Sequence, residues 1–164
     1  MEAIECRRSI REFSNAPVEP EKLAKIAEAF RLAPSARNLQ NWKLLIVTDP
    51  AVKERIREAQ PGKHEMLSKA PVILVGTCNS QEIMTNSHRI DSVDVSIAMS
   101  FAMLQAQELG LGTCWMAYYT EPEMKTALNL PESTSIVAIM PLGYPNEKPE
   151  ARPRKNINDI VEYI

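Results

Sequence analysis

A long apolar helix predicted over residues 91–109 is the feature that most constrains the fold of this chain. Between Val93 and Leu104, apolar side chains cover most of the helix circumference. They are not confined to one narrow stripe. They are Val95, Ile97, Ala98, Met99, Phe101, Ala102 and Met103. A helix that is apolar on several sides has to be buried on several sides. We therefore expect it to be the central element, with the other elements arranged around it.

Shorter periodic segments flank this helix in the sequence. Apolar residues at i, i+3, i+4 and i+7 predict a helix over 20–32, and Asp49-Pro50 is a typical start for a helix that runs to about residue 60. Further patterns predict a helix over 121–128 and four strands, over 44–48, 72–77, 113–118 and 135–140. This alternation of short strands and helices indicates an α+β fold.

The 164 residues are expected to form a single domain over 1–164, because no internal repeat or linker divides them. Residues 143–164 are predicted to be an extended C-terminal tail. Its first part is rich in proline, and Ile157–Ile164 is too apolar to stay undocked. The surplus of apolar surface on so short a chain favours a dimer, on which this tail would dock.

Composition excludes several classes of protein. The net charge of −2 gives no general attraction to nucleic acid, and no apolar run is long enough to span a bilayer. The acidic start of the sequence does not match a secretory signal, so we expect a cytoplasmic protein. The 3 cysteines and 2 histidines show no metal-ligand spacing, so no metal site is expected.

Two compact basic clusters lie near the ends of the chain. The first contains Arg7, Arg8, Ser9 and Arg11, and the second is the segment 152–155. If the two converge, their guanidinium groups suit a phosphate monoester, which prefers bidentate partners. The alternative is that each cluster is an ordinary solvated surface.

A polar loop lies between the first predicted helix and the first predicted strand. Its hydroxyl and amide groups, held by proline and anchored by Trp42, suit hydrogen bonding to a planar polar heterocycle. The residues concerned are Pro34, Ser35, Ala36, Asn38 and Gln40. The alternative is a capped loop whose side chains satisfy their own backbone.

The common nucleotide signatures are missing. Gly110-Leu111-Gly112 has Trp115 where a dinucleotide motif needs its third glycine, and it follows a helix and precedes a strand, which is the reverse of the usual context. The chain also lacks a P-loop and the G-x-S-x-G motif. A monophosphate site without a pyrophosphate cradle fits FMN and does not fit FAD.

Four motifs in order resemble the nitroreductase family over essentially the whole chain. They are RRSIREF at 7–13, APSARNLQNW at 33–42, GLGTCWM at 110–116 and GYPNEKPEARPRK at 143–155. The resemblance implies a sandwich with a central, mostly antiparallel sheet flanked by helices. It also implies an intertwined homodimer with two FMN molecules at the interface, and it favours convergence of the basic clusters over the solvated-surface interpretation.

The resemblance also implies roles for individual residues. Basic and hydroxyl groups of both termini would hold the FMN phosphate, Arg11 would lie near the pyrimidine edge of the flavin, and the polar loop would come from the other subunit. The residues at the phosphate would be Arg7, Ser9, Arg152 and Arg154, and Arg8 would also bind the cofactor. The segment along one face of the ring would be Trp115, Met116, Ala117 and Tyr118. The long helix, with Asp94 and Met99, would be the dimer spine.

By the same resemblance, NADH or NADPH would pass electron pairs through the flavin to a small electron-poor acceptor such as a nitroaromatic or a quinone. No side chain acts as acid or base, while Arg11 gives electrostatic support to the reduced flavin. The short stretch 79–90 predicts an open pocket or one with a small lid. Tyr118 or Tyr119 would narrow the approach to the flavin, although we favour Tyr119 packing against the dimer partner.

Three alternatives remain open from the sequence. One is a specialised relative, such as a reductive dehalogenase or a flavin-fragmenting enzyme, and another is a non-catalytic FMN-binding or redox-sensing protein. The third is a dimeric scaffold in which the arginines pair with Glu5, Glu12 and the acidic residues of the tail. Lys63, His64 and Arg89 are further residues that fit the rim of a pocket.

Overall fold

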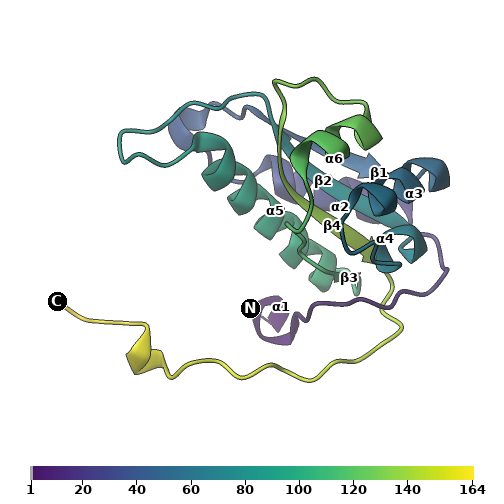
Figure 1. The fold of residues 1–164 in the computed structure, drawn as a ribbon. Coiled ribbons are helices and arrows are strands. Elements are labelled where there is room, and N and C mark those ends of the chain that lie inside the picture. Colours follow the sequence, from purple (N-terminus) through teal and green to yellow (C-terminus); the bar gives the residue numbers. More distant parts are fainter. Residues whose placement is uncertain (1) are drawn as a thin grey trace.

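Four strands form one antiparallel sheet in the order β1-β2-β4-β3 (Figure 1). The computed structural model, which describes residues 2–164, places β1 at Trp42–Val47, β2 at Val72–Cys78, β3 at Gly112–Thr113 and β4 at Ser135–Gly143. Both central strands, β2 and β4, are buried along nearly their whole length. The predicted α+β class with an antiparallel sheet is confirmed.

Helices cover both faces of this sheet, as the sandwich prediction requires (Figure 1). On one face lie α2 (Pro20–Arg31) and α5 (Ile90–Glu108), and on the other lie α3 (Pro50–Ala59), α4 (Met66–Lys69) and α6 (Glu121–Leu128). A short helix α1 (Glu2–Cys6) and two 3₁₀ turns, η1 (Ala36–Asn38) and η2 (Ile157–Asp159), complete the fold. The sequence did not predict α1, α4 or the two turns.

The long helix α5 is central, as its composition predicted. It packs closely on β2 because Gly76 has no side chain: a Cβ there would lie 2.7 Å from Val95 Cγ1 and 2.8 Å from Met99 Cγ. Met99 is fully buried in this contact. The other side of α5 is only partly covered, and Phe101 on it is 42% exposed.

The predicted strand over 113–118 is largely wrong, and Pro141 explains why. The register Gly112↔Gly143 continues to an isolated bridge between Met116 and Ile139. Midway, Cys114 N–H donates to the Pro141 carbonyl at 3.4 Å. Proline has no N–H to return this bond. The ladder is therefore interrupted, and the segment after β3 is irregular.

The tail after β4 extends away from the body of the molecule (Figure 1). Its apolar side chains are exposed: Ile157 is 63%, Ile160 64% and Tyr163 96% accessible. The chain itself does not cover these residues, so a C-terminal tail that docks on a dimer stays a prediction. No helix within residues 2–164 has the length and hydropathy needed to cross a membrane.

Candidate functional site

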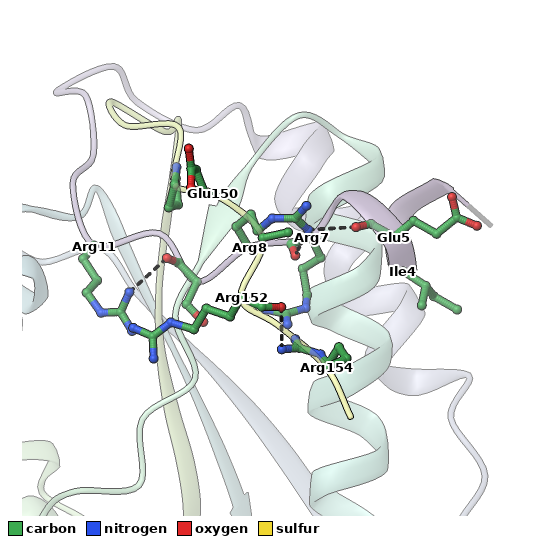
Figure 2. Close-up of a pocket in the computed structure, with 11 residues that line it drawn as sticks. Ile4, Glu5, Arg7, Arg8, Arg11, Glu150, Arg152 and Arg154 are labelled. Atoms are coloured by element: carbon green, nitrogen blue, oxygen red, sulfur yellow. Dashed lines mark hydrogen bonds between the residues drawn. The ribbon is translucent and has the colours of Figure 1, made fainter. Parts of the chain in front are cut away.

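The basic clusters from the two ends of the chain converge on one cavity of about 300 Å³ (Figure 2). We call it the arginine cavity. The N-terminal segment supplies Arg7, Arg8, Ser9 and Arg11, and the tail supplies Arg152 and Arg154. The predicted convergence of these six residues is thus present within a single chain. Figure 2 shows the arginine side chains gathering around this cavity from the two segments.

Within residues 2–164, the guanidinium groups of Arg8, Arg11 and Arg154 bond to backbone carbonyls. Arg8 Nη1 donates to the Glu5 and Arg7 carbonyls, each at 2.8 Å, Arg11 Nη1 to the Ser9 carbonyl at 3.2 Å, and Arg154 Nη1 to the Arg152 carbonyl at 3.3 Å. Within residues 2–164, none of the five arginines forms an ion pair with a carboxylate. Glu5 and Glu150 also line the cavity, but neither carboxylate pairs with these arginines in the described part of the chain, so an excess of positive charge faces the cavity, which speaks against the scaffold alternative.

Glu147 joins the two segments that form this cavity, and the sequence analysis missed it. Its Oε1 accepts the backbone N–H of Arg11 in a short hydrogen bond and that of Glu12 at 3.1 Å. The tail and the N-terminal segment are thereby held side by side. The motif around residues 143–155 contains this glutamate, but only the fold shows that it binds two amides, 136 and 135 residues away.

A second cavity, of about 470 Å³, lies beside the first, and we call it the tryptophan cavity. Arg11 lines both. One wall of the tryptophan cavity consists of residues 114–118, which include the predicted Trp115, Met116 and Ala117, and the opposite wall consists of residues 64–66. His64 thus belongs to the site, whereas Lys63 forms an ion pair with Glu58. An arginine-lined cavity and a less polar cavity therefore adjoin at Arg11.

The wall at residues 114–118 offers free backbone donors. The N–H and C=O of Met116 both bond to Ile139 of β4, at 2.9 and 3.0 Å. Backbone groups alternate in direction along an extended chain, so the N–H groups of Trp115 and Ala117 point away from β4. Within the described residues, neither of these two N–H groups has an acceptor. Burial raises the pKa of the Cys114 thiol, and Arg11 and Arg7 partly offset this.

The polar loop over 34–40 lies far from both cavities. The Asp94 carboxylate of α5 accepts the Ala36 N–H at 3.1 and 3.2 Å, so the loop is held near the N-terminal end of α5. The arginine segment lies at the C-terminal end, where Arg8 and Gln107 line a common groove. At 1.5 Å per residue, these two ends are about 20 Å apart. One chain therefore does not bring Ser35, Ala36, Asn38 and Gln40 to the arginine cavity.

Part of this loop satisfies its own backbone, as the alternative interpretation expected. Ser35 Oγ accepts the Gln40 N–H at 3.1 Å, and Gln40 Nε2 donates to the Asn38 carbonyl at 3.1 Å. However, Arg37, Asn38 and Gln40 all have positive φ angles, of 52°, 56° and 52°. Such backbone is costly for residues other than glycine and occurs often at binding sites.

One expectation about packing needs correction, and another stays a prediction. The long helix α5 stays the predicted dimer spine, although its Asp94 and Met99 side chains are buried against their own chain, on the face that meets the loop and the sheet. Tyr119 was expected to pack against a partner. It is instead partly buried against the core of its own chain, where its hydroxyl donates to the Ile136 carbonyl at 2.7 Å. Tyr118, in contrast, is 64% exposed and lines the tryptophan cavity.

The stretch over residues 79–90 forms a loop beside the polar loop. Glu82 pairs with Arg37, and Ile83 bridges to Arg89. Arg89 in turn pairs with the buried Asp91 at 2.5 Å. These residues line neither of the two cavities of their own chain. Whether this loop is a lid therefore depends on a second subunit.

Comparison with known proteins decides the family. A family model described as the nitroreductase family matches residues 4–60 and 57–144. The chain belongs to the nitroreductase family. The family resemblance predicted from four motifs is thereby confirmed.

Nitroreductase relatives match along nearly the whole chain. A putative NADH dehydrogenase/NAD(P)H nitroreductase of Methanothermobacter thermautotrophicus is 32% identical over 93% of this chain and 80% of its own. The solved structure of an FMN-dependent nitroreductase from Clostridium difficile has a TM-score of 0.83 at 29% identity, covering 98% of this chain and 96% of the other. Iodotyrosine deiodinase 1 of Sus scrofa is 26% identical, over 98% of this chain but only 66% of its own.

Proposed function

We propose that this chain is an FMN-dependent oxidoreductase that uses NADH or NADPH to reduce electron-poor small acceptors such as nitroaromatics and quinones. The names of its relatives, an NAD(P)H nitroreductase and an FMN-dependent nitroreductase, support this choice of donor and cofactor. The observation that carries the proposal is the meeting of the arginine cavity and the tryptophan cavity at Arg11.

The residues present fit FMN. Five arginines line this cavity against two carboxylates, Glu5 and Glu150, so an excess of positive charge suits the two charges of a phosphate monoester, and Ser9 adds a hydroxyl donor. The adjoining tryptophan cavity has one wall of apolar and aromatic side chains, which suits a planar ring system. Because nothing in this arrangement resembles a pyrophosphate cradle, FMN fits better than FAD.

When bound, FMN would supply the chemistry of accepting a hydride from the nicotinamide and passing it to the acceptor. The chain's own residues would bind and orient the flavin and would polarise its ring. Arg7, Arg152 and Arg154 would hold the phosphate end. Arg11 would place a positive charge where the reduced flavin becomes anionic, and the free N–H groups of Trp115 and Ala117 would donate to ring atoms.

We propose further that the enzyme is a homodimer and that the polar loop of each subunit completes the flavin site of the other. The loop and the arginine cavity lie at opposite ends of α5, so two chains in opposite orientation would bring one to the other. The half-covered side of α5 around Phe101 and the exposed tail around Ile160 supply apolar surfaces for this contact. The bare edge of β1 offers a further place for an extended segment of the partner.

A comparison of FMN with riboflavin tests the cofactor assignment. The two ligands share the ring and the ribityl chain and differ only in the phosphate. If the arginine cavity binds the phosphate, the apoprotein binds FMN at least a hundredfold more tightly than riboflavin, and Arg152→Ala reduces this ratio about tenfold. Equal affinities would remove the phosphate from the site and refute the assignment.

Because the tryptophan cavity is exposed, a reductase with a broad range of acceptors is favoured over a specialised dehalogenase. Tyr118 stands exposed at its mouth, and within residues 2–164 no segment of the same chain closes over it. A flavoprotein that only senses redox state would share this site but would not turn over NADH or NADPH. Turnover therefore separates the two proposals.

A further inference from the structure

We propose that Gln60 is a positioning residue that sets the spacing between the two walls of the tryptophan cavity, and so its fit to flat acceptors. The inference rests on the proposed function in naming an acceptor, but its structural part stands on contacts within the chain. One wall, residues 64–66, follows α3 in the sequence, and the other, residues 114–118, follows β3. A direct link between them would therefore fix the width of the cavity.

The Gln60 side chain forms this link. Its Nε2 donates to the Tyr118 carbonyl at 2.9 Å, and its Oε1 accepts the His64 N–H at 3.2 Å. The residue is fully buried, with no accessible surface. The two ends of one amide group thus bond to one backbone group in each wall.

The position of Gln60 is itself fixed. It caps the C-terminal end of α3, where its N–H donates to the Arg57 carbonyl at 3.2 Å and its carbonyl accepts the Lys63 N–H at 2.9 Å. One turn earlier, Ile56 is fully buried in the core beneath. A rigid helix end therefore carries the amide.

The turn that Gln60 closes is tight. Lys63 has a φ angle of 44°, and a Cβ on Gly62 would lie 2.7 Å from His64 Nε2, so the imidazole is folded over the glycine. The direction of His64 at the cavity wall thus depends on this turn as well as on Gln60.

An amide is required at residue 60 for a simple reason. Within the described residues, Gln60 is the hydrogen-bond partner of both the Tyr118 carbonyl and the His64 N–H. An apolar side chain of the same length would leave a donor and an acceptor unpaired. The two walls would then separate to admit water, because unpaired polar groups at a buried site are unfavourable.

The experiment compares Gln60→Met with Lys125→Met. Lys125 serves as the control, because its buried amine donates to the Glu132 carbonyl at 2.7 Å and pairs with the Glu121 carboxylate at 3.4 Å, yet it lines neither cavity. We expect Gln60→Met to raise the KM for a small nitroaromatic about five- to tenfold with a smaller change in kcat, the pattern of lost uniform binding. Lys125→Met should leave KM unchanged.

Hydrogen exchange gives the readout that does not depend on turnover. In Gln60→Met, the amides of 62–66 and 115–119 should both lose protection, while Lys125→Met should loosen α6 and the turn around Glu132 and leave both walls protected. Gln60→Glu keeps an acceptor for His64 and lacks the amide donor, so it should affect 115–119 more than 62–66, and it serves if the methionine variant does not fold. Unchanged protection of both walls in the Gln60 variants would overturn the proposal. An inactive wild-type protein would overturn the proposed function and leave the exchange result valid.

Discussion

The Asp94 carboxylate accepts the backbone N–H of Ala36 with both oxygens, at 3.1 and 3.2 Å, and so ties the central helix to the polar loop. Asp94 is only 6% exposed. The loop that it holds contains three non-glycine residues with positive φ. Such a conformation persists only where surrounding contacts impose it. Asp94 therefore stabilises the shape in which the loop would meet the flavin of the partner subunit.

Replacing Asp94 tests this relationship. We expect Asp94→Ala to lower the free energy of unfolding by about 2 kcal/mol, because a charged hydrogen bond is lost, and to weaken FMN binding as well. Asp94→Asn keeps an acceptor oxygen and should retain most of both. Chemical denaturation and FMN titration provide the two measurements. FMN affinity that stays at the wild-type value in Asp94→Ala would separate the loop from the flavin site.

We predict that Arg11 raises the midpoint potential of the bound flavin in addition to binding it. Removing a positive charge beside a ring that becomes anionic destabilises the reduced form, so Arg11→Ala should lower the midpoint potential by about 30 mV, which is about 1.4 kcal/mol for a two-electron couple. Arg152→Ala is the control, because Arg152 lines the arginine cavity but not the tryptophan cavity. It should weaken FMN binding without a comparable shift. Spectroelectrochemistry of the two variants decides between these outcomes.

We predict that Tyr119 makes the free energy of unfolding depend on pH in the alkaline range. Burial raises the pKa of its hydroxyl, with a smaller contribution from Glu121. The folded state therefore keeps the proton where the unfolded chain, with an ordinary tyrosine pKa of about 10, releases it. The contribution of Tyr119 is complete below pH 10 and is lost as the pH rises above this value.

The matched variant is Tyr119→Phe. It should cost about 1 kcal/mol at pH 7, because the hydrogen bond from the hydroxyl to the Ile136 carbonyl is lost. Between pH 10 and 11 the difference from wild type should shrink, as measured by urea denaturation at each pH. A difference that is constant over this range would show that Tyr119 does not titrate as expected.

Much of the fold follows from local sequence patterns. The apolar circumference of α5 and the Asp49-Pro50 start of α3 depend on neighbouring residues alone, and the structure confirms both. Pro141 shows the limit. This proline lies inside β4, but it interrupts the predicted strand over 113–118 on the neighbouring segment. Only the pairing register shows that the two segments meet.

The candidate site likewise has one part that the sequence predicts and one part that it does not. The basic clusters could be predicted because each is compact in the sequence. The links made by Gln60 and Glu147 could not, because each joins segments 58 or more residues apart through backbone atoms, which leave no mark on residue type. The orientation of Tyr119 likewise depends on a distant group, the Ile136 carbonyl of β4.

The dimer proposal predicts a sensitive face on α5. Phe101→Glu places a charge where we expect apolar contact, so the protein should become monomeric at micromolar concentration and should lose FMN with it. Glu123→Lys, an exposed change on α6 in the opposite layer, is the control. Sedimentation velocity reports the mass of each species. A Phe101→Glu protein that stays dimeric would place the interface elsewhere.

The most direct test of the account is the visible absorption spectrum of the purified protein under anaerobic conditions. We predict oxidised flavin bands that bleach when NADH or NADPH is added and return when a nitroaromatic or a quinone follows. Bands that persist after both nicotinamides would contradict the oxidoreductase assignment. A colourless protein that takes up no added FMN would contradict the flavin site itself.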